Sequence, residues 1–431
     1  MSRITHVGGG TSVPGVVIER LDPGFVERRA TELSGGTVLV SGTNGKTTTV
    51  AMIRAILKAQ GIETVSNESG ANLFRGVATT LLPHPLGGSV GVFESDEAVL
   101  ERLVVALKPR VLVLTNVFRD QLDRFSEPER VAHMLRSAAS RLPPGAVVIA
   151  NADDPMLWSA VERSSPIGFG VHPAASSDDV PDAEPEICSR CGERLVMKER
   201  TMAHLGRVTC ETCGWSSARP TLVAELVSSS SLGTTRLLID ETVIDLPAGG
   251  LYNAYNAAAA VATGEALGVA RDGAIRSLSS FRARFGRNER FDVEGRTAWL
   301  LLMKNPASAG VLTQQLGKDR DVGAVVVAVN DRIADGRDIS WIWDSDFERL
   351  ADLGIPLVPS GVRAADVAVR LRYAGAAPVT AEPRPVPAIR HALSLCPPDR
   401  SVAVMATYTA MLDVRQALLG SAVARLEDTM T

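Results

Sequence analysis

The segment that most constrains this chain is an apolar run followed by a glycine-containing loop and a helical stretch. Val38–Ser41 is apolar and β-branched, the loop runs from Gly42 to Lys46, and Val50–Leu57 has the pattern of a helix. In such a strand–loop–helix unit, backbone N–H groups and the helix N-terminus face an anion, a lysine adds positive charge and a threonine hydroxyl can hold Mg²⁺. The sequence therefore predicts a nucleotide-phosphate site formed by Gly42, Thr43, Asn44, Gly45, Lys46, Thr47 and Thr48.

This loop is tighter than the commonest phosphate-binding loop. Val40 stands where the first glycine of the usual G-x-x-x-x-G-K-[ST] spacing would lie, so a chance Gly-Lys-Thr turn is the alternative. The flanking strand and helix favour the phosphate site, because the mechanism requires both. Gly8–Gly10 is a second glycine cluster, but no strand precedes it and we expect a flexible loop there.

Short apolar runs alternate with helix-length segments from Val38 to about Gly170, which predicts βαβ units and a mostly parallel sheet. An Ala-rich helix is expected at Leu251–Leu267. The strands expected in this first part are Val38–Ser41, Glu63–Ser66, Val90–Glu94, Val111–Thr115, Ala146–Ala150, Pro166–Phe169, Leu222–Leu226 and Thr235–Leu246.

A chain of 431 residues is too long for one small core, and the alternation resumes after Thr297. Residues 172–186 are interpreted as a linker and Phe285–Gly295 as a hinge. The prediction is a lead-in (1–35), a central ATP-binding domain (36–290) and a smaller C-terminal α/β domain (291–431). Its strands are expected near Trp299–Met303, Ala324–Val329, Pro356–Pro359 and Val402–Ala406, with a last helix from Thr409 to Arg425.

Carboxylates and amides follow the ends of the predicted strands, where ligands of open α/β sheets bind. Glu94 closes a strand beside the phosphate loop and is predicted to bind Mg²⁺ together with Thr47. Asp96 and Glu97 are expected to be solvated loop charges. The same sheet edge should carry Asn116, Asp120, Asp123 and the segment Asn151-Ala-Asp-Asp-Pro155, although Asp120 and Asp123 could instead be charges at a helix N-terminus.

Four of the five cysteines form two C-x-x-C pairs, Cys188 with Cys191 and Cys210 with Cys213. This spacing predicts a zinc ribbon, inserted at 186–216, in a reducing compartment. Because four thiolates leave no open position on Zn²⁺, the metal should be structural. His204 is a weaker candidate ligand, and Cys396 is interpreted as a small buried residue.

Three further polar groups are candidate binding sites. Asn253 and Asn256 share a helix face and could hydrogen-bond a base or ribose, with capping as the other role for Asn253. Arg287 offers a guanidinium to a phosphate, or belongs to a solvated linker. The segment from Asn330 to Asp344 combines five carboxylate or amide side chains with two tryptophans, which indicates a contact surface or site.

A net charge of −4 and a pI of about 6.0 point to neither nucleic acid nor an anionic membrane surface. The N-terminus shows no signal segment, and no apolar run approaches the length of a membrane span. We therefore expect a cytoplasmic protein without a membrane span and without a nucleic-acid partner.

Taken together, these motifs resemble the Mur ligase family. The segment Ser41–Thr48, Glu94, the segment Asn151–Pro155, Asn253-Ala-Tyr-Asn256 and Gly286-Arg287 recur there in this order. The chain is more closely similar to the branch that forms the synthetase subunit of lipid II isoglutaminyl synthase. That branch has a four-cysteine ribbon and a segment like Asn330-Asp-Arg-Ile-Ala-Asp-Gly-Arg-Asp-Ile-Ser-Trp341, and the similarity extends from about residue 37 to about residue 415.

Two departures from the wider family stand out. Gln121 occupies a position where many members have a metal-binding histidine, which puts the ligand of a second metal in doubt. Residues 1–35 are too few for a domain that holds a UDP-sugar, which fits a lipid-carried muropeptide.

The resemblance implies ATP-dependent amidation of the α-carboxylate of D-glutamate in the lipid II stem peptide, with Mg²⁺ and at the inner face of the membrane. Lys46 and Glu94 would be catalytic, Asn253 and Asn256 would hold the adenine, and Arg287 would contact a phosphate. Ammonia would come from a GatD-like glutamine amidotransferase subunit. Asp338 would reach across to complete that partner's Cys–His pair, with Asp335 and Asp344 as the neighbours that could be confused with it and capping as the alternative role.

Two other functions compete with this one. A ligase of the folylpolyglutamate synthetase type would share the phosphate loop but would not account for the ribbon. A zinc-ribbon binding protein with a regulatory nucleotide site would show no ATP turnover with any acceptor.

Overall fold

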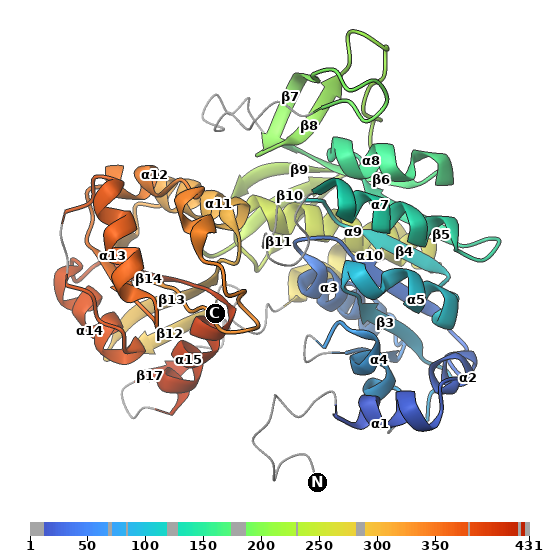
Figure 1. The fold of residues 1–431 in the computed structure, drawn as a ribbon, viewed down its shortest axis with the longest axis horizontal. Coiled ribbons are helices and arrows are strands. Elements are labelled where there is room, and N and C mark those ends of the chain that lie inside the picture. The colour runs from blue at the N-terminus through green and yellow to red at the C-terminus, as the bar shows by residue number, and fades with distance from the viewer. Residues whose placement is uncertain are drawn as a thin grey trace.

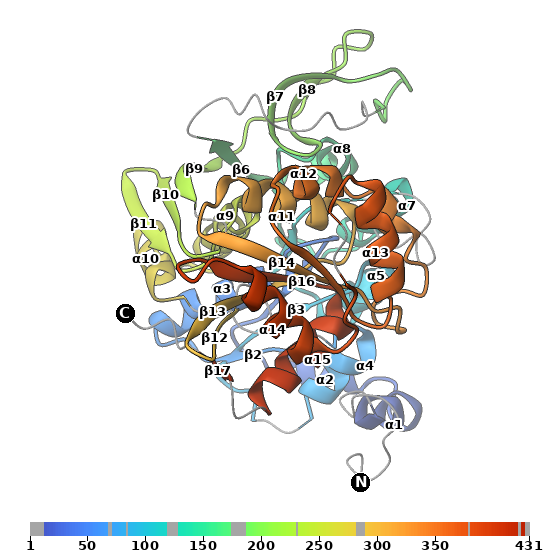
Figure 2. The ribbon, with the colours of Figure 1, turned by 90° about the vertical axis from the view of Figure 1, so that its left-hand side faces the viewer.

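The computed structural model describes residues 13–67, 71–82, 85–118, 128–173, 187–229, 232–281, 289–377, 380–420 and 424–426. These residues form two α/β units, each built around its own sheet, and a separate two-stranded hairpin (Figure 1). Turned by 90°, the second unit stands in front of the first (Figure 2). Among the described residues, no helix is both long and apolar enough to cross a lipid bilayer.

The first unit contains, within the described residues, a nine-stranded sheet in the order β11-β10-β9-β6-β5-β4-β1-β3-β2. Neighbouring strands from β9 to β2 are parallel, whereas β10 and β11 extend the edge as antiparallel strands. The strands are β1 (Thr37–Ser41), β2 (Thr64–Val65), β3 (Val90–Glu94), β4 (Val111–Leu114), β5 (Val147–Asn151), β6 (Ile167–Pro173), β9 (Leu222–Ser229), β10 (Thr235–Ile239) and β11 (Thr242–Leu246).

Helices cover both faces of this sheet. Val38 and Val40 of β1 belong to a buried cluster with α3 (Lys46–Ala59), α9 (Leu251–Ala266) and α10 (Arg271–Ser277). Leu39 points to the other face, where α2, α4, α5, α7 and α8 pack. Burial on both faces explains why these strands read as continuous apolar runs. The helices of this second face are α2 (Phe25–Thr31), α4 (Phe74–Thr80), α5 (Glu97–Leu107), α7 (Pro128–Ser140) and α8 (Pro155–Val161).

The second unit is a six-stranded sheet within the described residues, in the order β15-β14-β16-β13-β12-β17. Strands β15 to β13 are parallel, and β12 and β17 are antiparallel additions. One face packs on α11, α12 and α13, and the other on α14 and α15. The elements are β12 (Glu289–Val293), β13 (Arg296–Leu302), α11 (Pro306–Lys318), β14 (Val322–Ala328), α12 (Phe347–Asp352), β15 (Leu357–Ser360), α13 (Ala364–Tyr373), α14 (Pro385–Leu395), β16 (Ser401–Ala406), α15 (Tyr408–Leu419) and β17 (Ala424–Leu426).

The four paired cysteines lie in a segment that we call the cysteine ribbon (residues 187–217). It contains the antiparallel hairpin of β7 (Val196–Met202) and β8 (Leu205–Thr209), inserted between β6 and β9. The hairpin projects from the first unit beside α8 (Figure 1).

Several sequence predictions were confirmed and others were wrong. Strand Val90–Glu94 and the start of the helix at Leu251 agree with β3 and α9. The expected strand Thr235–Leu246 is a hairpin, because Asp240 adopts φ +51° and turns the chain between β10 and β11. The predicted hinge is in part β12, while residues 282–288 lie outside the described residues.

The two chain ends also differ from expectation. The predicted last helix ends at Leu419 with Gly420 as its C-cap, and Ala424–Leu426 pairs with β12 instead. The lead-in contains α1 (Val13–Leu21) and α2, and Gly15 N donates to Thr79 Oγ1 of α4 at 2.9 Å. Of the predicted linker, residues 174–186 lie outside the described residues.

Candidate active site

The phosphate loop joins the carboxyl end of β1 to the N-terminus of α3, as the sequence predicts. Gly45 is the N-cap of α3 and has φ +87°, a conformation that glycine adopts freely. A Cβ atom at this position would lie 2.3 Å from Asn256 Oδ1. Glycine therefore allows α9 to approach the loop closely.

Lys46 is held inside the loop. Its Nζ donates to the carbonyl oxygen of Gly42 at 2.6 Å and to Glu97 Oε1 at 2.8 Å. Both side chains of this ion pair are at least nine-tenths buried. The charge of Lys46 is thus fixed at the place where a phosphate would bind.

The expectation that Asp96 and Glu97 are solvated is wrong. Both are buried because β3 turns directly into α5, and Asp96 becomes the N-cap that accepts from Ala98 N at 3.0 Å. Glu97, the first residue of α5, is thereby directed to Lys46 rather than to solvent.

The two predicted Mg²⁺ ligands lie together. Thr47 Oγ1 donates to Glu94 Oε2 at 2.6 Å. Asn67 fixes the end of β3, since its Nδ2 donates to Glu94 O and its Oδ1 accepts from Glu94 N, both at 2.9 Å. A hydroxyl and a carboxylate beside a phosphate loop are the oxygen ligands that Mg²⁺ prefers.

The end of β4 contacts the loop from the other side. Asn116 Oδ1 accepts from Asn44 N at 2.8 Å, and Thr43 Oγ1 accepts from Phe118 N at 3.0 Å. Thr115 Oγ1 donates to Asn44 O at 2.7 Å. The further candidates Asp120, Gln121 and Asp123 lie outside the described residues.

The two asparagines of α9 have different positions. Asn256 faces the cavity at the phosphate loop, and its Oδ1 accepts from Thr49 Oγ1 at 3.2 Å. Asn253 donates to Gly249 O at 2.7 Å and accepts from Asn256 Nδ2 at 3.1 Å. Asn253 therefore orients Asn256 from behind, and Arg287 lies outside the described residues.

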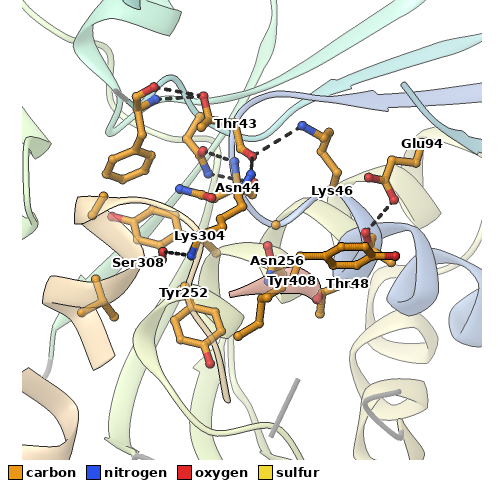
Figure 3. Close-up of a pocket in the computed structure, with 18 of the residues that line it drawn as sticks. Thr43, Asn44, Lys46, Thr48, Glu94, Tyr252, Asn256, Lys304, Ser308 and Tyr408 are labelled. Carbon is orange, nitrogen blue, oxygen red and sulfur yellow. Dashed lines mark hydrogen bonds between the residues drawn. The ribbon is translucent and has the colours of Figure 1, made fainter. Parts of the chain in front are cut away.

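The second unit completes the site. Lys304 follows β13, and its Nζ donates to Thr43 O at 2.7 Å (Figure 3). Asn305 caps α11 through Ser308 N at 2.9 Å and lies 3.4 Å from Asn44 Oδ1. Both units thus meet over the phosphate loop.

Between the two units lies a cavity of about 410 Å³. Its polar part includes the phosphate loop with Asn72, Glu94, Asp96, Glu97, Asn116, Asn256, Lys304, Ser308, Asp335 and Thr407. Its apolar part includes Phe118, Met202, Leu205, Tyr252, Tyr255, Ala307, Val311 and Leu312. A pocket with a few convergent polar groups and apolar walls is the usual form of a small-molecule site.

Asp335 and Asp338, in the loop after β14, have opposite environments. Asp335 lines the cavity and accepts from Thr409 N at 2.7 Å, and burial raises the pKa of its carboxyl. Asp338 is exposed and accepts from Ser340 N at 2.8 Å, which lowers the pKa of its carboxyl. The structure thus places Asp338 away from the cavity, facing solvent; Asp344 is exposed as well.

The segment Asn151–Pro155 is structural within the described residues. Asp154 caps α8 through Leu157 N at 2.9 Å and accepts from Val117 N at 2.7 Å. Asp153 accepts from Tyr255 OH at 2.9 Å, and burial raises the pKa of its carboxyl. These residues tie β4, β5, α8 and α9 together rather than line the cavity.

The four cysteine sulfur atoms lie within 4.8 Å of one another. In both C-x-x-C turns, a glycine N–H donates to the first cysteine's carbonyl at 2.9 Å, from Gly192 and from Gly214. His204 lies elsewhere, with its ring 4.5 Å from that of Phe118. Cys396 is buried, as predicted.

Some site residues were missed from the sequence. Asn67, Glu97 and Lys304 each act through contacts between distant segments, which no local pattern reports. Asn305-Pro306 did carry a signal, because asparagine followed by proline is typical of a helix start after a strand.

Family models match two parts of the chain. The Mur ligase middle domain matches residues 40–185, and the MurT ligase C-terminal domain matches residues 302–411. Fold and site thus define a ligase of the Mur class.

Two curated relatives narrow the class. The MurT subunit of lipid II isoglutaminyl synthase (glutamine-hydrolyzing) from Streptococcus pneumoniae is 34% identical, over 98% of this chain and 96% of the relative. The subunit of the same name from Staphylococcus aureus is 31% identical, over 85% of this chain and 83% of the relative. The chain belongs to the MurT family.

Solved structures are similar in fold. A pseudomurein peptide ligase type C from Methanothermus fervidus superposes with a TM-score of 0.70 at 23% identity, covering 90% of this chain and 79% of that chain. MurF from Acinetobacter baumannii gives 0.67 at 18%, covering 93% and 81%. FolC from Escherichia coli gives 0.59 at 14%, covering 92% of both. At these identities the likeness concerns the fold alone.

Proposed function

We propose that this chain is the synthetase subunit of a lipid II isoglutaminyl synthase. It would use ATP to convert the α-carboxylate of D-glutamate in the stem peptide to an amide. The observation that carries the proposal is the pairing of Thr47 with Glu94 at 2.6 Å beside the buried charge of Lys46. The name shared by the curated relatives supports it.

The reaction has two steps. A carboxylate oxygen of the acceptor attacks the γ-phosphorus of ATP, the bond to the β,γ-bridging oxygen breaks, and ADP leaves. Ammonia then attacks the acyl carbon, phosphate leaves with the C–O bond electrons, and the nitrogen loses a proton to give the amide. Phosphorylation is needed because a carboxylate oxygen is a poor leaving group.

The residues of the cavity would stabilise and align these charges. Lys46 and Lys304 would neutralise phosphate oxygens, and the N-terminus of α3 would face them. Thr47 and Glu94 would hold Mg²⁺, which supplies further charge neutralisation. Positioning of the acceptor against the γ-phosphate accounts for the remaining rate enhancement.

Ammonia would come from a glutamine amidotransferase partner. The name of the Streptococcus pneumoniae relative includes glutamine hydrolysis and calls that relative a subunit. Asp338 is exposed, so its carboxylate is free to face another chain and to orient a histidine of a Cys–His pair there. Its competing role is to bind Ser340 N.

The cysteine ribbon would bind structural Zn²⁺. Four sulfur atoms within 4.8 Å and two equivalent turns fit tetrahedral Cys₄ ligation, in which no position is left for a substrate. The test is metal analysis: we expect one zinc per chain, lost in Cys210→Ser. Zinc retained in that variant would contradict the assignment.

The lipid-linked acceptor implies action at the inner face of the membrane, which the protein would reach from the cytoplasm.

We also propose the division into a lead-in (1–35), a central domain (36–290) and a C-terminal domain (291–431). Asn256 would hydrogen-bond the adenine, and Asn253 would orient Asn256.

The function is tested by mass spectrometry of the product. Purified protein is incubated with lipid II and Mg-ATP, first with ammonium and then with glutamine. We expect an acid-to-amide mass change with ammonium, and with glutamine only when the amidotransferase subunit is added. Glutamate ligation instead of amidation would indicate the folylpolyglutamate synthetase type, and no ATP turnover with any acceptor, partner present, would indicate a binding protein.

A further inference from the structure

The cysteine ribbon reaches the cavity at the end opposite its cysteines. The turn between β7 and β8 brings Met202 and Leu205 to the cavity wall. Both side chains are buried, with 6% and 0% exposure. Met202 and Leu205 are therefore packed against the rest of the protein and form a fixed part of the cavity wall.

Contacts with the first unit fix this turn. Gly206 N donates to Asp153 O at 2.6 Å, and Thr201 Oγ1 donates to Val171 O at 3.3 Å. The ring of His204 packs edge-on against Phe118, whose N–H binds Thr43 of the phosphate loop. A single residue, Phe118, therefore connects the turn of the ribbon with the phosphate loop.

The same turn belongs to a hydrophobic cluster that spans both units. Phe118, Met202, Leu205 and Tyr255 are buried in one cluster, against which Ala307 and Val311 of α11 pack. Tyr252 packs there as well. The apolar half of the cavity is consequently built by the ribbon, α9 and α11 together.

The chemistry of this half suits a planar heterocycle. The described cations that line the cavity, Lys46 and Lys304, both lie at the phosphate loop, where the anionic acceptor would also be neutralised. Asn256 uses one of two amide hydrogens on Asn253, which leaves a donor for a base edge. The predicted metal ligand Glu94 is the last residue of β3, whereas Phe118 follows β4 on the other side of β1.

We propose that the turn of the cysteine ribbon, through Met202 and Leu205, is a wall of the nucleotide-base subsite. This inference rests on the proposed use of ATP. The ribbon then does more than stabilise the fold, because its turn shapes the site that sets nucleotide affinity and base selection.

The test is calorimetric binding to the full chain of two probes, Mg-ADP and Mg-tripolyphosphate, which has no base. Met202→Ala should weaken ADP binding by roughly 5- to 10-fold, as expected for lost apolar contact, and leave tripolyphosphate binding unchanged. Met202→Leu, which keeps the volume, should restore ADP affinity. Met197→Ala on the same strand is the matched control, since Met197 packs near the cysteines instead, and it should bind both probes as the wild type does.

Three outcomes would overturn the proposal. Unchanged ADP affinity in Met202→Ala would show that Met202 does not contact the base. Equal weakening of ADP binding in Met197→Ala would indicate a general loosening of the ribbon. A raised KM for the muropeptide with unchanged ADP affinity would assign the wall to the acceptor. Absence of amidation in the wild type with intact ADP binding would refute the proposed function but not this subsite.

Discussion

The phosphate loop and the loop after β14 show how differently two predicted sites can be built. Around the phosphate loop, Lys46, Thr47 and Glu94 are buried or half-buried and bonded to one another or to the backbone. In the loop after β14, Asp338 is exposed and accepts a hydrogen bond from Ser340 N. The described groups of the first site bind one another within the chain, whereas the second offers a solvent-exposed carboxylate that we propose to face a partner chain.

The largest expected effect separates the two sites by nitrogen source. Asp338→Asn should lower glutamine-driven amidation by about 10³–10⁴-fold in the complex, because a neutral amide cannot orient and stabilise a charged histidine. Ammonium-driven amidation should be nearly unchanged. Asp344→Asn, also exposed, is the control. Equal loss with both nitrogen sources would place Asp338 in the synthetase reaction instead.

Lys46→Ala should affect both nitrogen sources alike. Removing a charge that is preorganised against the transferred phosphoryl group costs on the order of 10²–10³-fold in kcat. The loss should be the same with ammonium and with glutamine, measured as amide product. A loss of amide product only with glutamine would contradict the assignment of Lys46 to phosphoryl transfer, which both nitrogen sources require.

Glu97→Gln should have a smaller effect, of roughly tenfold, mainly on the affinity for Mg-ADP. Glu97 holds Lys46 in place, and as an anion it would not itself bind a phosphate, so kcat should change less than KM for ATP. Glu101→Gln is a control in the same helix, because Glu101 is half-buried and accepts from Ser137 Oγ of α7 rather than from Lys46. A kcat loss as large as that of Lys46→Ala would mean that Glu97 takes part in the reaction directly.

The smallest effect concerns stability and pH within the loop after β14. Burial raises the pKa of Asp335, so the folded state binds the proton more tightly than the unfolded state, and this contribution is lost as pH rises above about 4. In Asp335→Asn that decline should disappear, so the free energy of unfolding should fall less between about pH 4 and about pH 6 than it does in the wild type. Urea unfolding at both pH values measures it. An unchanged pH dependence would show that hydrogen bonds from Thr409 offset the burial.

Much of the site was predictable because its signals are local. The strand, glycines and Lys-Thr pair of the phosphate loop follow one another in the chain, and so do the two C-x-x-C turns. The end of β3 placed Glu94 correctly beside Thr47, since parallel strands end at one sheet edge. The two pairs of cysteines met as their spacing predicts.

Other features depended on which segments meet. Asp96 and Glu97 look like loop charges in the sequence, yet the tight passage from β3 to α5 buries both and gives Glu97 a lysine partner. The short strands β12 and β17 escaped prediction because only their pairing with each other and with β13 makes them strands.

The sequence by itself determined the phosphate loop, the alternating α/β pattern of two sheets, the cysteine pairs and, through its motifs, the family. These follow from residues that are neighbours in the chain or share one strand or helix face. Tertiary structure alone decided that Lys304 reaches Thr43, that Asn256 meets Thr49, and that the ribbon's turn lines the cavity. Such contacts join residues as many as 261 positions apart, and their geometry is set by how the two sheets and the ribbon pack rather than by any local preference.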